Sequence, residues 1–97
     1  MKPAQVHPEA EAEANGAFEW YWSRSESSAL AFYAELREAF SVLRKSPRMC
    51  APYLQGSRRL MLKRFPYFVV FRELPRKIQI IAVAHAKRRP GYWRGRV

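Results

Sequence analysis

The chain has 97 residues, 48% of them hydrophobic and 14% aromatic, which is enough for one domain with its own core and excludes disorder of the whole chain. A single cysteine excludes an internal disulfide and fits a reducing cytosol. Residues 1–17 lack the apolar stretch of a signal peptide, and no uncharged apolar run approaches the roughly 18 residues of a membrane span. We therefore expect one soluble, cytoplasmic domain over residues 1–97 that has no membrane partner.

The formal net charge is +10, and it is concentrated in the second half of the chain. Residues 1–50 contain six Lys or Arg against seven Asp or Glu, whereas residues 51–97 contain twelve against one, Glu73. Like charges repel one another, so a folded domain with such a focused field usually has a polyanionic partner, such as nucleic acid, the ribosome or an acidic protein segment. A solvated basic surface without a partner is the alternative.

The N-terminal part of the chain predicts a brief edge strand followed by a helix. Residues 4–7 suit the strand, and Pro8 with the acidic residues after it starts the helix, because proline fits the first turn and acids complement the helix dipole. We expect this helix to end near Arg24. Its apolar residues recur at helical spacing and comprise Ala10, Ala14, Phe18, Tyr21 and Trp22.

Trp20 lies off this apolar stripe, close to the opposite side of the helix. Its ring either packs against the second helix of a hairpin or stays exposed and anchors a partner, as exposed tryptophans often do. Both interpretations stay open at the level of the sequence.

Residues 25–46 give the clearest helical pattern. Ser25, Ser27 and Ser28 are candidate N-caps, and the helix ends at Ser46 because a residue before proline is disfavoured in the α region. The apolar residues fall within about 120° of a helical wheel. They are Ala29, Phe32, Tyr33, Leu36, Ala39, Phe40 and Leu43.

Three apolar runs follow a loop at 47–57 and predict strands at 58–65, 67–73 and 78–84, since β-branched and aromatic residues dominate them. The short connections favour antiparallel pairing. We therefore predict an α+β fold with the order β-α-α-β-β-β. Two helices form a hairpin and pack on one face of a small, mostly antiparallel sheet.

The first of these three runs indicates what the other face of the sheet carries. Leu60 and Leu62 alternate with Arg59, Met61 and Lys63, and alternating residues of a strand point to opposite faces. One face should therefore be apolar, and the other should carry basic groups.

The usual catalytic and metal sites are missing from the sequence. The two His and one Cys have no metal-ligand spacing, there is no glycine-rich phosphate loop, and Glu73 is the only acid after residue 38. Cys50 lies in a Met-Cys-Ala-Pro loop and is a poor candidate for a nucleophile. We expect neither a cofactor nor a metal.

Arg, Lys, His and Tyr without acids suit one reaction, the cleavage of RNA by its own 2′-hydroxyl. His or Tyr can transfer protons, and Arg or Lys can stabilise the charge on the phosphate. The candidates are Lys63, Arg64, Tyr67, His85, Arg88, Arg89 and Tyr92.

Structural roles compete with this hypothesis for several of the same residues. His85 is equally suited to a structural place at the end of a strand. Tyr92 and Trp93, after the Pro-Gly pair at 90–91, can fold back and fill the base of the core. Arg94 and Arg96, with the neighbouring arginines, can bind an acidic protein without any chemistry.

The order of elements and many residues of the C-terminal half resemble the RelE/ParE superfamily, the toxins of bacterial type II toxin–antitoxin modules. Residues 7–10, His-Pro-Glu-Ala, and the pair Trp20-Tyr21 are also similar to this family, so the resemblance covers nearly the whole chain. The residues that carry it in the C-terminal half are Arg58, Arg59, Leu62, Arg64, Phe65, Pro66, Tyr67, Phe71, Arg72, Ile80, Ala82, Val83, Ala84, His85, Arg88, Arg89, Pro90, Gly91, Tyr92, Trp93 and Arg96.

The resemblance implies a toxin that arrests growth when free and is neutralised by a co-encoded antitoxin. It leaves the target open between DNA gyrase, which ParE-like members poison, and the ribosome, where RelE-like members cleave messenger RNA. The tail from His85 to Arg89 looks more like the ParE side, or like an uncharacterised branch between the two. A third possibility is an inactive binding module that is retained for its antitoxin.

Residue roles follow from the resemblance by position. For an RNase the counterparts are Lys63, Arg64, His85, Arg88 and Tyr92, with Arg64, His85, Arg88 and Tyr92 as the catalytic set. Residues implied to bind nucleic acid or another target are Arg58, Arg59, Lys63, Lys87, Arg89, Trp93 and Arg96. Residues implied to bind the antitoxin are Trp20, Arg58 and Arg89.

Overall fold

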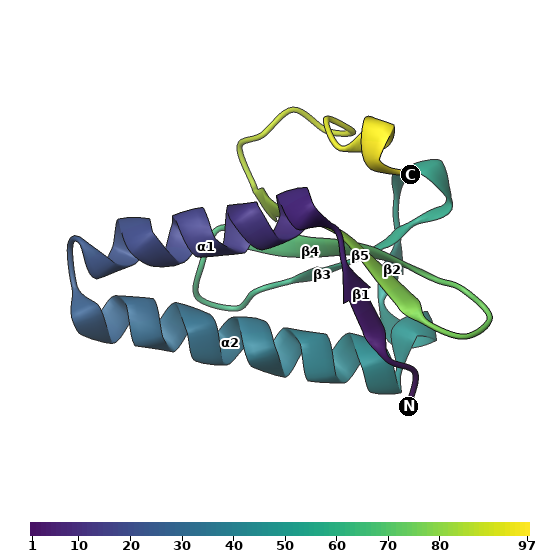
Figure 1. Cartoon of the computed structure of the whole chain (residues 1–97), viewed down its shortest axis with the longest axis horizontal. Coiled ribbons are helices and arrows are strands. Elements are labelled where there is room, and N and C mark those ends of the chain that lie inside the picture. Colours follow the sequence, from purple (N-terminus) through teal and green to yellow (C-terminus); the bar gives the residue numbers. More distant parts are fainter.

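The computed structural model describes all residues from Met1 to Val97 and shows a helical hairpin packed on a five-stranded sheet (Figure 1). The strands are β1 (Ala4–Val6), β2 (Ala51–Pro52), β3 (Arg58–Met61), β4 (Tyr67–Glu73) and β5 (Ile78–His85), and the helices are α1 (Pro8–Trp22) and α2 (Glu26–Lys45). Short 3-10 turns lie at Pro47–Met49, Leu54–Gly56 and Arg94–Arg96. No helix has the length and apolar character needed to cross a membrane.

The strand order in the sheet is β1-β5-β4-β3-β2. β1 pairs with β5 in parallel, and the other neighbours are antiparallel, so the predicted α+β fold with a mostly antiparallel sheet is confirmed. β2 was not predicted, because two residues that include Pro52 carry too little pattern to distinguish a strand from a loop.

β3 ends at Met61 and not at residue 65. The backbone N–H groups of Lys63 and Arg64 donate to the carboxylate of Glu35 on α2 and not to a neighbouring strand. The chain therefore turns early toward β4, and the predicted strand was four residues too long.

The helices begin and end where local chemistry predicts. Nδ1 of His7 accepts from the N–H of Glu9 at 3.1 Å and caps α1, and Oγ of Ser25 accepts from the N–H of Ser28 at 3.3 Å and caps α2. α2 ends at Lys45, just before the predicted stop.

The apolar faces of both helices pack on one face of the sheet and form the first core. α2 contributes Phe32, Leu36 and Leu43, which meet Val69 and Phe71 from β4. Tyr33 is 51% exposed, so the buried stripe of α2 is narrower than predicted.

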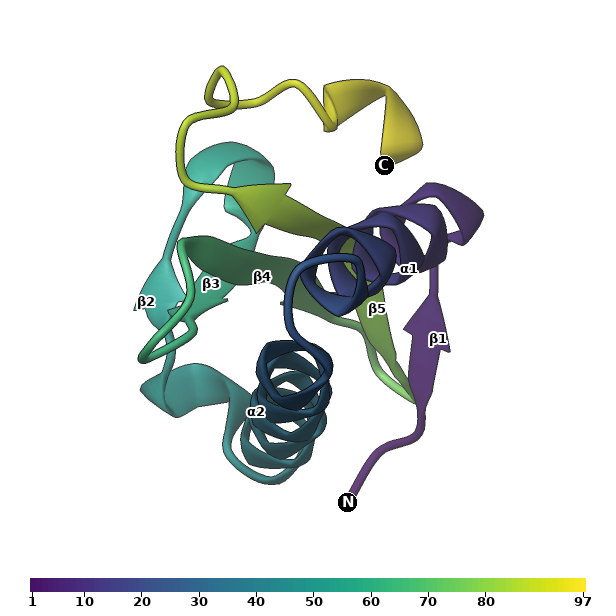
Figure 2. The same ribbon diagram turned by 90° about the vertical axis from the view of Figure 1, so that its left-hand side faces the viewer.

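The second face of the sheet is not an open basic surface. Phe68, Val70 and Ile81 are buried there with Trp93, which is 1% exposed. The C-terminal segment returns over the side of the sheet that faces away from α2 (Figure 2). The sequence prediction for this face holds in part: Arg59 of β3 lies there against Phe68, but the chain's own C-terminal residues cover the middle of the face, and Trp93 takes the core-filling position.

Candidate functional site

Residues 86–97, here called the C-terminal arm, leave the end of β5 and fold back over the second face of the sheet (Figure 2). The N–H of Ala86 donates to the carbonyl of Pro66 at 2.8 Å, and the N–H of Arg88 donates to the carbonyl of His85 at 3.0 Å. The buried ring of Trp93 fixes the far half of the arm. The arm thus has a defined position on the fold.

Glu13 of α1 holds the end of the arm. Its carboxylate accepts from the hydroxyl of Tyr92 at 2.6 Å and from both terminal nitrogens of Arg96 at 2.9 and 3.0 Å. It also accepts from the backbone N–H of Val83 at 3.0 Å. Val83 lies in β5, beyond the residues that pair with β1. We call this arrangement the Glu13 clasp.

The clasp changes the acid–base character of Tyr92. Burial and the hydrogen bond to Glu13 raise the pKa of Tyr92 well above its ordinary value of 10.0. The hydrogen bond to Glu13 also raises the pKa of Arg96. The Tyr92 hydroxyl is therefore a committed donor at neutral pH and a poor source of phenolate.

The basic residues and tyrosine of the tail were predicted as a set without acids, and this prediction was wrong, because Glu13 contacts both Tyr92 and Arg96. Sequence reasoning missed Glu13 because Ala and Glu alternate through residues 9–14, a pattern typical of any exposed helix. No local signal connects it to Tyr92, which lies 79 residues further along the chain.

Arg88 lies beside the clasp. Its guanidinium carbon sits 3.8 Å from the centroid of the Tyr92 ring, and a polar hollow is lined there by Arg88, Arg89, Tyr92 and Arg96 together with His7 and Glu9. Two of the four catalytic candidates, Arg88 and Tyr92, therefore do lie together.

His85 occupies a different place at the end of β5. Its Nδ1 accepts from the N–H of Lys87 at 3.0 Å, so this ring nitrogen is occupied by the backbone. Its ring packs edge-on against Tyr67, with centroids 5.0 Å apart, and burial raises the pKa of Tyr67. No hydrogen bond joins His85 to Tyr92.

Trp20 lines the same cleft as His85, and Tyr67 is also part of its wall. Trp20 is 52% exposed and carries the guanidinium of Arg24 at 3.7 Å from its ring centroid. The aromatic ring beside it is Tyr21 of its own helix, so Trp20 does not take the expected place against α2.

Arg64 forms a third separate group with α2. Its Nε is 3.1 Å from Oε2 of Glu35, whose carboxylate also accepts the backbone N–H groups of Lys63 and Arg64. Burial alone would raise the pKa of Glu35, but these hydrogen bonds hold it below its ordinary value. Arg64 is consequently paired with a carboxylate and is not a free cation.

The remaining predicted contact residues differ in accessibility. Arg58 donates to the carbonyl of Cys50 at 2.8 Å, and Arg59 lies 4.4 Å from the ring centroid of Tyr53. Lys87 and Arg89 are exposed. Trp93 is buried, so its side chain is not accessible to a partner in this conformation. Burial also raises the pKa of the Cys50 thiol, which fits its role as a core residue.

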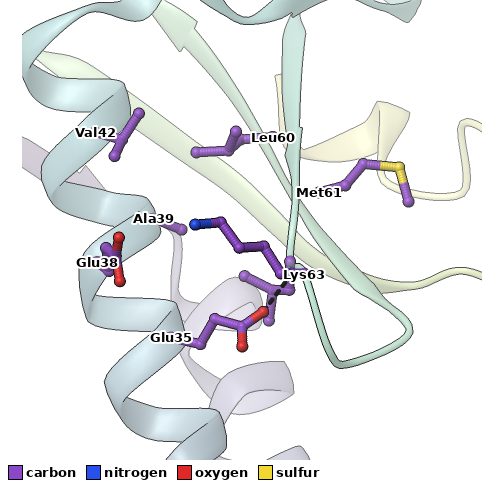
Figure 3. Close-up of a pocket in the computed structure, with 8 residues that line it drawn as sticks. Glu35, Glu38, Ala39, Val42, Leu60, Met61 and Lys63 are labelled. Carbon is purple, nitrogen blue, oxygen red and sulfur yellow. Dashed lines mark hydrogen bonds between the residues drawn. The ribbon is translucent and has the colours of Figure 1, made fainter.

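An apolar groove runs between α2 and β3 (Figure 3). Val42 of α2 faces Leu60 of β3 across it, and the side chain of Lys63 reaches toward Ala39 from one end (Figure 3). The outer edge of β3 beside this groove is paired only at Arg58 and Arg59, where β2 ends. We call it the α2–β3 groove.

Together these features define a small, basic α+β domain that carries a polar hollow beside the arm and an apolar groove between α2 and β3. A solved structure described as the chromosomal ParDE TA system from P. aeruginosa has the same fold, with a TM-score of 0.77 and 22% identity over 90% of this chain and 98% of the other. A comparison with curated proteins finds no match.

The family model described as the ParE toxin of the type II toxin–antitoxin system, parDE, matches residues 4–90. The chain belongs to this ParE toxin family.

Proposed function

We propose that this ParE-family toxin arrests growth by binding DNA gyrase and that it does not cleave RNA. One observation carries the choice: the candidate proton-transfer groups, Tyr92 and His85, and the candidate phosphate-stabilising Arg64 lie in three separate places and are largely committed to other contacts. Tyr92 donates to Glu13, His85 accepts from the backbone of its own strand end, and Arg64 is paired with Glu35.

Cleavage at a 2′-hydroxyl needs an acid, a base and a phosphate-stabilising cation around one atom group. The raised pKa of Tyr92 and its hydrogen bond to Glu13 make its hydroxyl a weaker acid than an ordinary phenol. A binding function needs no such convergence, and it uses the exposed cations as contacts. Acting on gyrase requires the toxin in the cytoplasm, where we place it.

A co-encoded antitoxin would neutralise this toxin, and the α2–β3 groove suits part of it. An amphipathic segment with apolar side chains would fill the space between Val42 and Leu60, and an acidic side chain would reach Lys63. The exposed Trp20 offers a second anchor on the helical hairpin.

The proposal is tested by inducing the toxin without antitoxin and following thymidine and amino-acid incorporation in parallel. Thymidine incorporation should fall first, and purified toxin should inhibit supercoiling by gyrase. The variants Arg64→Ala, His85→Ala and Tyr92→Phe should remain toxic if they stay folded. Early loss of amino-acid incorporation, with toxicity abolished in folded forms of these variants, would instead establish the RNase alternative.

If neither incorporation falls while the antitoxin still binds, the chain is a binding module without toxicity. A Val42→Glu change in the groove tests the surface proposed for the antitoxin separately from the surface proposed for gyrase. It should weaken antitoxin binding and leave inhibition of gyrase intact, because α2 and the arm lie on opposite sides of the sheet (Figure 2).

A further inference from the structure

Some cations of this chain are held in ion pairs: Glu73 pairs with both Lys2 and Arg48, Glu35 with Arg64, and Glu13 with Arg96. Others form no ion pair. One set of these lies on the arm and on the neighbouring strand β3. We call it the cationic surface, and it consists of Arg59, Lys87, Arg88, Arg89 and Arg94.

We propose that the cationic surface binds the phosphate backbone of duplex DNA. The assignment deepens the proposed function and rests on it for the choice of DNA over other duplexes, since gyrase holds a DNA segment while it acts. Arginine is well suited to this ligand because its planar guanidinium donates two parallel hydrogen bonds to phosphate oxygens.

The arm presents these cations in a fixed arrangement. The carbonyl of Arg89 accepts from the N–H of Tyr92, and the carbonyl of Gly91 accepts from the N–H of Arg94, at 3.2 and 3.0 Å. Gly91 has φ of 77°, and a Cβ at this position would lie 2.6 Å from Nε of Arg94. Glycine at position 91 thus leaves room for the side chain of Arg94 to cross the turn. Because the backbone of the arm is already ordered, it loses less conformational entropy when a ligand binds.

The aromatic rings of this face favour a backbone ligand over splayed single-stranded bases. Base stacking needs an open ring face. Here Arg88 covers Tyr92 at 3.8 Å and Arg59 covers Tyr53 at 4.4 Å, while Trp93 is buried. A guanidinium group thus occupies a face of each of the two tyrosine rings, and the indole of Trp93 is not accessible to a base.

An acidic protein segment fits this surface less well than a nucleic acid does. A protein segment gains much of its affinity from buried apolar anchors. The exposed residues of the arm between 86 and 95 are charged or small, whereas apolar lining is found in the α2–β3 groove on the other side of the sheet. A ligand that is charged along its whole length complements the arm.

The test is the anisotropy of a short labelled DNA duplex titrated with toxin alone at several salt concentrations. The variant Lys87→Gln/Arg89→Gln/Arg94→Gln removes three exposed cations from the surface. The matched control, Arg37→Gln/Lys45→Gln/Arg76→Gln, removes three exposed cations that also lack ion pairs but lie elsewhere. Both variants have the same net charge, and thermal unfolding checks that both stay folded.

The surface variant should bind at least about tenfold more weakly, and the slope of log K against log salt should fall in magnitude by about 2.7, since each lost phosphate contact removes about 0.9. The control should change affinity by less than about threefold. Equal losses in both variants would overturn the assignment. Tighter binding of wild-type toxin to duplex RNA, single-stranded RNA or poly-glutamate than to DNA would do the same.

Capture of purified gyrase with and without bound DNA separates this inference from the proposed function. Relative to wild type, the surface variant should lose more affinity for the gyrase–DNA complex than for DNA-free gyrase, because only the complex offers a phosphate backbone. Undiminished capture of that complex would overturn the inference and leave the proposed function standing. A wild-type toxin that binds the duplex but neither form of gyrase would support the surface assignment and end the gyrase proposal.

Discussion

Replacing Glu13 by Gln should loosen the C-terminal arm more than any other change of one polar group. The carboxylate accepts four hydrogen bonds, from Val83, Tyr92 and twice from Arg96. The side chains of Glu13 and Arg96 are only 16% and 11% exposed. The variant therefore leaves a largely buried guanidinium without its counter-charge.

The cost follows from this burial. Removing one partner of a buried ion pair destabilises a protein by roughly 3–5 kcal/mol. Arg96 keeps a hydrogen bond to the carbonyl of Ile81 at 3.2 Å, and the glutamine oxygen can still accept, so about 2–4 kcal/mol is expected here. An unfolding entropy of about 2.1 cal/mol/K per residue gives roughly 200 cal/mol/K for this chain, and Tm should fall by about 10–20 °C.

Thermal unfolding followed by circular dichroism measures this loss, and Glu9→Gln is the matched control. Glu9 is 70% exposed and 3.9 Å from Arg96, so its loss should cost less than about 0.5 kcal/mol. Trypsin should also cut the arm after Lys87 and Arg88 faster in Glu13→Gln than in the control. A Glu13→Gln protein that unfolds within about 3 °C of wild type would refute the view that the clasp holds the arm.

Three further changes test other contacts. Trp93→Ala should destabilise the fold by about 3–5 kcal/mol, measured by denaturant unfolding, because a buried indole leaves a large cavity; a cost under about 1 kcal/mol would mean that the arm does not cover the sheet in solution. Glu35→Gln should cost about 1–2 kcal/mol at neutral pH. Since the pKa of Glu35 is depressed below 4.5, its contribution is present above that pH and lost as the pH falls below it, so the wild-type advantage should vanish in acid; an advantage unchanged in acid would contradict the pairing. The raised pKa of Tyr92 gives a contribution that is present below pH 10.0 and lost as the pH rises above it, and ultraviolet titration should show late-titrating phenols, one of which disappears in Tyr92→Phe; an unchanged number of late phenols in the variant would rule this out.

The sequence predicted those elements whose signal is local. The periodic apolar face of α2 and its stop before Pro47 need only neighbouring residues, and so do the β-branched runs of β4 and β5. The end of β3 was misplaced because the acceptor for Lys63 and Arg64 is a side chain on a helix nearly thirty residues earlier.

The candidate site was predictable by residue type but not by arrangement. Arg88 and Tyr92 were predicted as members of one candidate set, and the structure brings the two side chains together. The partner of Tyr92 was not predictable, because pairing a helix residue with a tail residue depends on how the tail crosses the sheet. Trp93 illustrates the same point, since its burial depends on an uncovered sheet face that no local pattern reveals.

The basic surface available to a partner is smaller than the count of twelve basic residues against one acid in residues 51–97 suggests. Acids from the first half reach into the second, where Glu13 neutralises Arg96 and Glu35 neutralises Arg64. The Glu13–Arg96 pair lies under the arm, and the Glu35–Arg64 pair lies at the turn before β4. Glu13 and Glu35 therefore stabilise these two places and also reduce the charge that Arg96 and Arg64 present to a partner. The exposed part of the arm is then the place where unpaired positive charge is concentrated.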